Sequence, residues 1–252
     1  MHVVHQIRAG MDNTFYMVGD SERQRGVLID PFDGDSALTA VERIGWRPEA
    51  VINTHGHWDH VGGNDAIRER YDVPIYAHPL EEVPHAQPLG ERVDMVGVAY
   101  DVLHTPGHRP GHVCLRGAGN IFTGDTLFVA GSGNPRFGGN VDDLYQSFRF
   151  LADQSDDLWM HPGHDYAAKN LSFSKEWEPG NPALDDAIRH FEALADSGDT
   201  HRSRLRDEKR WNLFFRLDSP EVRTNLAAAG HIQPGATDAD VFRTLRELRN
   251  NF

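Results

Sequence analysis

Cysteine is nearly absent from this chain, which has one, Cys114, among 252 residues. A single cysteine cannot form an internal disulfide, so the fold does not depend on an oxidising compartment. Cys114 stands in a short apolar run, which favours a buried structural thiol over a catalytic one. No apolar run is long enough to span a membrane, and the N-terminus lacks the basic and apolar regions of a secretory signal. We therefore expect a cytoplasmic protein without a membrane partner.

Positive charge is also scarce. The chain has 38 acidic and 25 basic residues, a formal net charge of -13, and only three of the basic residues are lysine. A protein that binds nucleic acid needs a basic surface against the phosphates, so this acidic surplus argues against nucleic acid as a partner. Hydrophobic residues make up 39% of the chain, which at this length is enough for one substantial core and a small second domain.

The most informative stretch is 53–63, Asn-Thr-His-Gly-His-Trp-Asp-His-Val-Gly-Gly, directly after a short apolar run that predicts a buried strand. Successive side chains of extended backbone alternate in direction, so His55 and His57 can point at one metal ion. Asp59 and His60 follow in the turn and can hold a second ion nearby. The two glycines that close the stretch remove Cβ atoms where we expect a tight bend before a helix.

Three later positions supply further potential ligands, each after a predicted strand. They are His108 in Thr-Pro-Gly-His, Asp125 in Phe-Thr-Gly-Asp and His164 in His-Pro-Gly-His. The Pro-Gly turns present both histidines from fixed loops, and a carboxylate can bridge two cations because it has two oxygens. Ligand sites of α/β proteins gather where strands end, so we expect these side chains to meet.

The remaining pattern predicts strands and helices in the first part of the chain and helices alone after about Tyr166. The N-cap of the first helix is expected at Asp35 or Ser36. The predicted strands are 3–7, 15–18, 27–29, 50–52, 74–77, 100–103, 112–115, 120–122 and 158–160, and the predicted helices of the first part are 36–44, 64–71 and 141–152.

Taken in order, these motifs resemble the metallo-β-lactamase superfamily. The set is Thr-His-x-His-x-Asp-His-x-Gly-Gly, Thr-Pro-Gly-His, Thr-Gly-Asp-Thr-Leu-Phe and Pro-Gly-His-Asp-Tyr. Within it the chain is most similar to glyoxalase II, the hydroxyacylglutathione hydrolase family, which it also resembles at 12–13, 178–181 and 212–216. The resemblance implies an α+β fold: an αββα sandwich, residues 1–166, as a metal-binding catalytic domain, then a small helical substrate-binding domain, residues 167–252.

The resemblance also implies a role for each potential ligand. His55, His57 and His108 would hold the first ion, Asp59, His60 and His164 the second, and Asp125 would bridge them. The ions would be two divalent metals, zinc, iron or manganese, which this mixture of imidazole and carboxylate admits. Asp59 would also orient the nucleophile, and His112 would support the site by hydrogen bonding.

The expected reaction is hydrolysis of a 2-hydroxyacyl thioester, S-lactoylglutathione in the family, by a hydroxide shared between the two ions. Arg136, Tyr166, Arg246 and Arg249 are the residues expected to bind substrate. The chain departs from the family in one respect: a lysine and a tyrosine that grip glutathione in some members are replaced by Asn134 and Arg136. Glutathione and another low-molecular-weight thiol therefore both remain open as the carrier.

The same motifs are compatible with other functions. A persulfide dioxygenase on the same fold would need one iron held by His55, His108 and Asp125, a facial triad with open positions. Hydrolysis of a lactone or a β-lactam, and a metal-binding protein without catalysis, are further alternatives. The pattern does not fix the oligomeric state.

Overall fold

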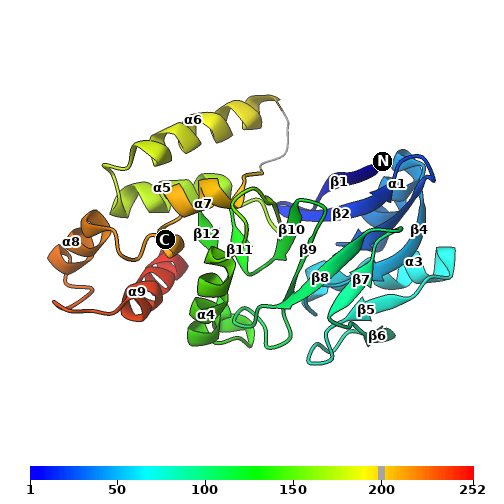
Figure 1. Cartoon of the computed structure of the whole chain (residues 1–252), viewed down its shortest axis with the longest axis horizontal. Coiled ribbons are helices and arrows are strands. Elements are labelled where there is room, and N and C mark those ends of the chain that lie inside the picture. Colours follow the sequence, from blue (N-terminus) through cyan, green and yellow to red (C-terminus); the bar gives the residue numbers. More distant parts are fainter. Residues whose placement is uncertain (198–201) are drawn as a thin grey trace.

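The structure is a computed structural model that describes residues 1–197 and 202–252. Two β-sheets pack face to face, helices cover their outer faces, and a group of helices from the end of the chain adjoins one side of the sandwich (Figure 1). The expected αββα sandwich followed by a helical C-terminal part is confirmed.

The first sheet has six strands in chain order. Its first three strands pair antiparallel and its last four pair parallel. The strands are β1 (His2–Ala9), β2 (Asn13–Asp20), β3 (Arg25–Ile29), β4 (Arg47–Ile52), β5 (Ile75–Ala77) and β6 (Ala86–Pro88).

The second sheet has five strands in the order β13-β10-β9-β8-β7. All of its pairs are antiparallel except β10 with β13, which are parallel. A two-stranded ribbon, β11 (Leu127–Phe128) and β12 (Gly131–Ser132), follows β10. The strands of the second sheet are β7 (Arg92–Asp94), β8 (Ala99–His104), β9 (Val113–Gly117), β10 (Asn120–Gly124) and β13 (Trp159–Pro162).

Alternation along the strands builds the layers. In β2, Tyr16 and Val18 join the core between the sheets, whereas Phe15 and Met17 face the outer helices. The second sheet divides in the same way, because Leu115 points inward and its neighbour Cys114 points outward. Strands buried on both faces read as continuous apolar runs, and this is why the sequence marks them clearly.

The helices α1 (Gly34–Ile44) and α3 (Asn64–Tyr71) cover the first sheet, and α4 (Val141–Ala152) covers the second. The short helix α2 (Trp58–Val61) lies within the histidine-rich motif. The C-terminal helices share one apolar core with α4 and the outer face of the second sheet. They are α5 (Ala167–Trp177), α6 (Pro182–Ser197), α7 (Leu205–Trp211), α8 (Pro220–Ala228) and α9 (Asp238–Asn251), with the 3-10 turn η2 (Leu213–Phe215) between α7 and α8.

Two local expectations need correction. The N-cap of α1 is Asp33, whose carboxylate accepts from the Ser36 backbone N–H, and neither Asp35 nor Ser36 caps the helix. The glycines at 62–63 have ordinary right-handed backbone, so no tight bend requires them. A Cβ at Gly62 would lie 2.4 Å from the carbonyl oxygen of Phe32, so close packing against the 31–33 segment is what requires glycine there. Among the described residues, no helix has the length and apolar character needed to cross a membrane.

Candidate metal centre and substrate cavity

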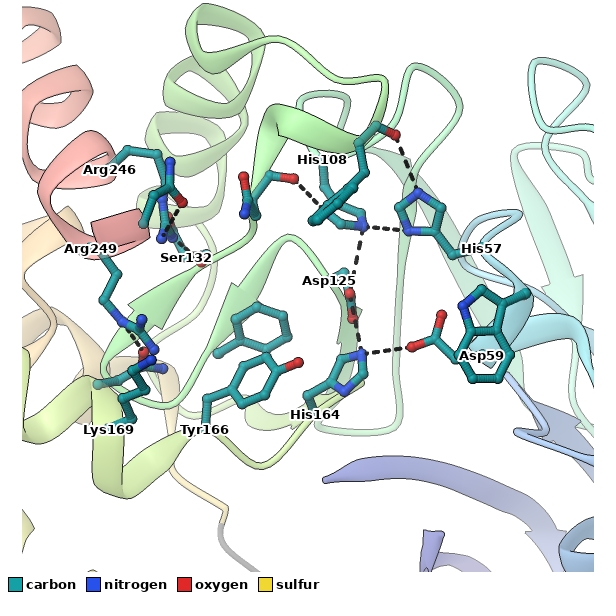
Figure 2. A pocket seen from close by; sticks show the side chains of 16 residues that line it. His57, Asp59, His108, Asp125, Ser132, His164, Tyr166, Lys169, Arg246 and Arg249 are labelled. Atoms are coloured by element: carbon teal, nitrogen blue, oxygen red, sulfur yellow. Dashed lines mark hydrogen bonds and ion pairs between the residues drawn. The ribbon is translucent and has the colours of Figure 1, made fainter. Parts of the chain in front are cut away.

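The loops that follow β4, β8, β10 and β13 meet at one edge of the sandwich and line a cavity of about 520 Å³. Five of the predicted ligands line it: His57, Asp59, His108, Asp125 and His164 (Figure 2). The other two, His55 and His60, are buried beneath it. The structure therefore brings together all seven residues that the sequence singled out.

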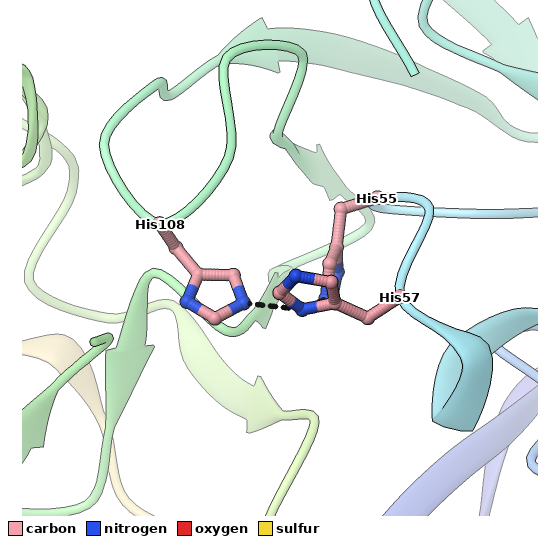
Figure 3. Close-up of side chains that lie close together, drawn as sticks. All are labelled: His55, His57 and His108. Atoms are coloured by element: carbon pink, nitrogen blue, oxygen red, sulfur yellow. Dashed lines mark hydrogen bonds between the residues drawn. The ribbon is translucent and has the colours of Figure 1, made fainter. Parts of the chain in front are cut away.

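Three histidines form a first cluster (Figure 3). The Nε2 atom of His55 lies 3.1 Å from Nδ1 of His57, and Nε2 of His108 lies 2.9 Å from the same Nδ1. Two nitrogens bound to one tetrahedral zinc ion at about 2.0–2.1 Å would lie roughly 3.4 Å apart. The three nitrogens thus have the spacing of ligands that share an ion.

A second cluster consists of Asp59, His60 and His164. The Nε2 atoms of the two histidines are 3.2 Å apart, and the Asp59 carboxylate is 3.4 Å from His164 and 3.9 Å from His60. Asn13 donates a hydrogen bond of 3.1 Å to Asp59 Oδ2 and so fixes this carboxylate.

Asp125 lies between the clusters. Its Oδ2 is 3.5 Å from Nε2 of His108 in the first cluster and 3.4 Å from Nε2 of His164 in the second. Its Oδ1 is 3.4 Å from His60, is buried, and has no hydrogen-bond partner among the described residues. A buried carboxylate oxygen without a donor is costly unless a cation satisfies it, so this position fits a bridging ligand.

The outer ring nitrogen of each of the five histidines has an acceptor, so the inner nitrogen faces the centre, where a cation would take the place of a proton. Two of the acceptors are carboxylates, two are backbone carbonyls and one is a hydroxyl. The pairs are His55 with Thr54 Oγ1 (3.1 Å), His57 with Phe137 O (3.3 Å), His60 with Asp30 Oδ2 (3.1 Å), His108 with Asn134 O (2.8 Å) and His164 with Asp12 Oδ1 (3.0 Å).

Burial and neighbouring charges shift the pKa values within the centre. Burial acts to raise the pKa of Asp125, but the charges of His164 and His60 hold it well below its usual range. Burial also acts to raise the pKa of Asp59, but the His164 hydrogen bond and the His60 charge outweigh burial and hold this pKa below its usual range. Burial acts to lower the pKa of His164, yet Asp125 above all raises it to about 11. Burial lowers the pKa of His108 to about 4. The carboxylates are therefore ionised where cations would bind.

The roles of Asp30 and Glu81 were not found from the sequence. Asp30 groups with His55 and His60, but its oxygens accept from the Thr54 N–H (2.7 Å), the Thr54 hydroxyl (2.6 Å) and His60, so it supports a ligand and is not one itself. It follows an apolar strand directly, the same signal that marked Asp125. The buried Glu81 accepts from the backbone N–H groups of Gly56 and Gly111, both at 2.8 Å, and so ties two ligand loops together.

His112, the predicted supporting residue, is buried beneath the centre. Its Nε2 accepts from the backbone N–H of Asp125 at 3.0 Å, and its Nδ1 lies 2.9 Å from Oγ1 of Thr126. Both ring nitrogens are engaged, so neither is available to an ion.

The other end of the cavity is positively charged. Tyr166, Arg246 and Arg249 line it, and so does Lys169, which the sequence did not single out. The Tyr166 ring stacks on His164 with centroids 5.0 Å apart. Arg136 is exposed on the 3-10 turn η1 (Pro135–Phe137) and is not among the residues that line the cavity.

Two protein families and several known proteins are similar to this chain in sequence. The sequence pattern of the metallo-beta-lactamase superfamily matches residues 8–164, and that of the hydroxyacylglutathione hydrolase C-terminus matches residues 165–252. The hydroxyacylglutathione hydrolase of Polaromonas sp. is 38% identical, and that of Nitrosococcus oceani 36% identical, each over 95% of both chains.

Among solved structures, ETHE1 from Myxococcus xanthus superposes with a TM-score of 0.66 at 24% identity, covering 97% of this chain and 98% of that one. A structure titled TTHA1623 in a di-iron-bound form has a TM-score of 0.60 at 27% identity, covering 82% of this chain and 98% of that one.

The fold and the histidine–aspartate cluster are those of a metallo-β-lactamase superfamily protein. Similarity to the relatives above extends over nearly the whole length, including the C-terminal helices. The chain therefore belongs to the hydroxyacylglutathione hydrolase, or glyoxalase II, family of thioester hydrolases.

Proposed function

We propose that this protein hydrolyses a 2-hydroxyacyl thioester of the S-lactoylglutathione type at a centre of two divalent metal ions. The observation that carries the proposal is the pair of ligand clusters joined by Asp125, at one end of a cavity whose other end is cationic. The full-length similarity to hydroxyacylglutathione hydrolases supports the same substrate class.

The second cluster favours two ions over one. A mononuclear iron centre would be held by His55, His108 and Asp125. It would give no ligand role to Asp59, His60 and His164, whose side chains also converge on one point. The inner nitrogens of the last two histidines are 3.2 Å apart, and both face the carboxylates of Asp59 and Asp125, which is the arrangement of ligands around a shared cation. Zinc, iron and manganese all suit these ligands.

When bound, the two cations supply a hydroxide nucleophile at neutral pH and polarise the thioester carbonyl. On the protein side, Asp59 lines the cavity and is held by Asn13, so we assign it the orientation of the attacking water. His112 holds the backbone of Asp125 in place. The leaving thiol has a pKa of about 8.5, so its departure does not require a strong acid from the protein.

We assign substrate binding to the C-terminal helical part, residues 167–252, whose α9 places Arg246 and Arg249 against the cavity. Tyr166, on the last ligand loop, adds a ring beside the metal centre. The cationic end suits a thiol carrier with negative charge, as glutathione has. We place the reaction in the cytoplasm, because the one cysteine, Cys114, is buried and the fold needs no disulfide.

The test is metal content by mass spectrometry, measured together with hydrolysis of S-D-lactoylglutathione. We expect close to two metal ions per chain and rapid hydrolysis, both lost in Asp125→Asn, with Asp65→Asn on the exposed face of α3 as the matched control. One iron per chain and no thioesterase activity would contradict the proposal. Two metal ions without hydrolysis would keep the centre and remove glutathione as the carrier.

A further inference from the structure

The cavity is lined by aromatic side chains on both sides of the metal centre. These residues are Trp58, Phe128, Phe137 and Tyr166. The rings of Phe128 and Tyr166 pack edge to face with centroids 5.2 Å apart, and Tyr166 stacks on His164. In Figure 2 Tyr166 lies between Lys169 and His164, so this pair belongs to the cationic side of the cavity. The other two aromatic residues are placed differently.

Trp58 and Phe137 are exposed at the cavity, with 74% and 62% of their surface accessible. A single exposed apolar side chain needs no explanation, but two beside one site mark a binding surface. Among the large hydrophobic side chains exposed in the described part of the chain, only these two line the cavity. Neither belongs to a hydrophobic core cluster of the described residues, so packing of the fold does not explain them.

Trp58 is fixed between the two ligand clusters by its place in the chain. It is the first residue of α2, directly after His57 of the first cluster and directly before Asp59 of the second. Its ring packs against that of Phe32, with centroids 5.8 Å apart, and most of the indole remains open to solvent. The ring is therefore held beside the metal centre and is free to contact a substrate.

Phe137 is held beside His57 by its own backbone. Its carbonyl oxygen accepts from Nε2 of His57 and from Nη1 of Arg109, both at 3.3 Å. Its ring lies edge to face with the His57 ring, with centroids 6.3 Å apart. The η1 turn that carries Phe137 begins with Pro135, whose ring restricts the backbone, and the Asn134 side chain caps it. The aromatic ring is thus presented from a fixed turn.

The geometry of a thioester determines which part of a substrate reaches these two rings. The sulfur, the oxygen and the acyl substituent diverge from the trigonal carbonyl carbon. In the proposed function the oxygen faces the metal centre, and the sulfur leads the carrier toward the cationic end. In Figure 2 Arg249 lies on one side of the cavity, and His57 and Asp59 lie on the other. The acyl substituent therefore extends toward the side on which Trp58 stands.

We propose that Trp58 and Phe137 form the binding surface for the acyl substituent and give this protein a preference for 2-hydroxyacyl groups with an aromatic ring or a longer alkyl chain in place of the methyl group of lactate. A methyl group covers little of either ring, whereas a phenyl group on the same carbon removes apolar surface from water and makes aromatic contacts. The inference rests on the proposed function, since it takes a thioester as the substrate, and names the class of acyl group.

The experiment compares two acyl substituents on one carrier, both in substrates and in ligands that resist hydrolysis. The substrates are S-D-mandeloylglutathione, with a phenyl group, and S-D-lactoylglutathione, with a methyl group. The ligands are the thiocarbamates S-(N-methyl-N-phenylcarbamoyl)glutathione and S-(N,N-dimethylcarbamoyl)glutathione, whose dissociation constants are measured by calorimetry on the metal-loaded protein. Because the carrier is the same in every compound, a ratio between the two members of a pair reports the acyl side alone.

The variants remove each ring in turn. They are Trp58→Ala, Phe137→Ala and the double variant, with Trp58→Phe as the conservative change. Phe150→Ala is the matched control, because Phe150 is an exposed aromatic residue of α4 that does not line the cavity. Metal content is measured for each variant, since Trp58 adjoins two metal ligands in the chain.

We expect the unaltered protein to bind the phenyl ligand about tenfold more tightly than the dimethyl ligand, which corresponds to roughly 55 Å² of apolar surface removed from water. This preference should fall to about threefold in each alanine variant and disappear in the double variant, because each ring supplies part of it. Trp58→Phe should retain most of the preference, and Phe150→Ala all of it. The ratio of kcat/KM for the mandeloyl and lactoyl substrates should fall in the same variants.

Equal affinity of the unaltered protein for the two ligands would overturn the inference, and so would failure of the phenyl ligand to bind. A preference that persists in the double variant would also overturn it, even with a loss of affinity common to both ligands, since such a loss reports damage to the centre. Absence of hydrolysis of both substrates by the unaltered protein would instead remove the proposed function. The ratio of dissociation constants would still decide whether the two rings bind the acyl group.

Discussion

His60 and Asp30 are joined by a hydrogen bond of 3.1 Å between Nδ1 and Oδ2, and both side chains are buried. The carboxylate fixes the imidazole so that Nε2 faces the second ligand cluster. Asp30 has a positive φ of 55°, a conformation that asparagine also tolerates.

Asp30→Asn should therefore fold and still weaken metal binding. Loss of a partner of this kind typically lowers metal affinity 10–100-fold, about 1.4–2.7 kcal/mol. The measurement is competition with a chelator for bound zinc, with Asp65→Asn as control. An unchanged affinity would show that the Thr54 contacts alone hold this part of the site.

Gly133 lies where the chain after the β11–β12 ribbon passes close to the backbone of Asp125, the predicted bridging ligand. A Cβ at this position would lie 1.9 Å from the carbonyl oxygen of Asp125, a contact that only movement of the backbone can relieve. We expect Gly133→Ala to lose most hydrolytic activity and some bound metal. Gly90→Ala is the matched control, because its nearest neighbour atom would be 3.9 Å away. Full activity in Gly133→Ala would show that the loop moves freely.

Removal of the Glu81 side chain should lower the stability of the folded protein. Its side chain is fully buried and accepts from two backbone N–H groups and from Arg109 Nε at 3.2 Å. In Glu81→Ala those donors lose their acceptor, and we expect the free energy of unfolding to fall by about 3 kcal/mol. Urea unfolding of the metal-free protein measures this, and a loss below 0.5 kcal/mol, the size of an ordinary surface change, would contradict it.

Glu208 predicts a pH dependence of stability. Burial raises its pKa to about 7, and hydrogen bonds from Ser203 and the Ala130 backbone only partly oppose this. A carboxyl whose pKa is higher folded than unfolded binds more protons in the folded state, so stability falls as pH rises from about 4.5 to about 7. Its contribution to the free energy of unfolding should drop by up to about 3 kcal/mol over that window.

The check is urea unfolding at several pH values for the unaltered protein and for Glu208→Gln. The variant should lose this part of the pH dependence, whatever its overall stability. Parallel pH profiles for the two proteins would refute the assignment.

The sequence predicted the fold because its strands are buried on both faces and its helices carry apolar stripes. The bounds of α3 and α4 match the predicted ranges, 64–71 and 141–152. The two-residue strands β11 and β12 were not predicted, since so short a segment shows no periodicity. The cap at Asp33 was missed because two other residues nearby are equally good caps by type.

The metal ligands could be predicted because each occurs in a compact motif at a strand end. Asp30 and Glu81 could not be assigned roles, because their partners are 24 or more positions away and only the folded chain brings them together. Lys169 has the sequence context of an ordinary helix residue, and only the folded chain places it beside α9 in the cavity lining. Arg136 seemed well placed in the chain but is exposed and is not among the residues that line the cavity.

The backbone carbonyls that hold His57 and His108 both come from residues 134–137, whereas the second cluster waits for His164 and for the pairing of Thr14 N–H with Gly163 O at 2.8 Å. During synthesis, the first three-histidine cluster and its supports leave the ribosome well before the second cluster can close. In the proposed two-metal centre, the first cluster can therefore capture its ion on a nascent chain, and the second cluster can do so only after Thr14 has paired with Gly163.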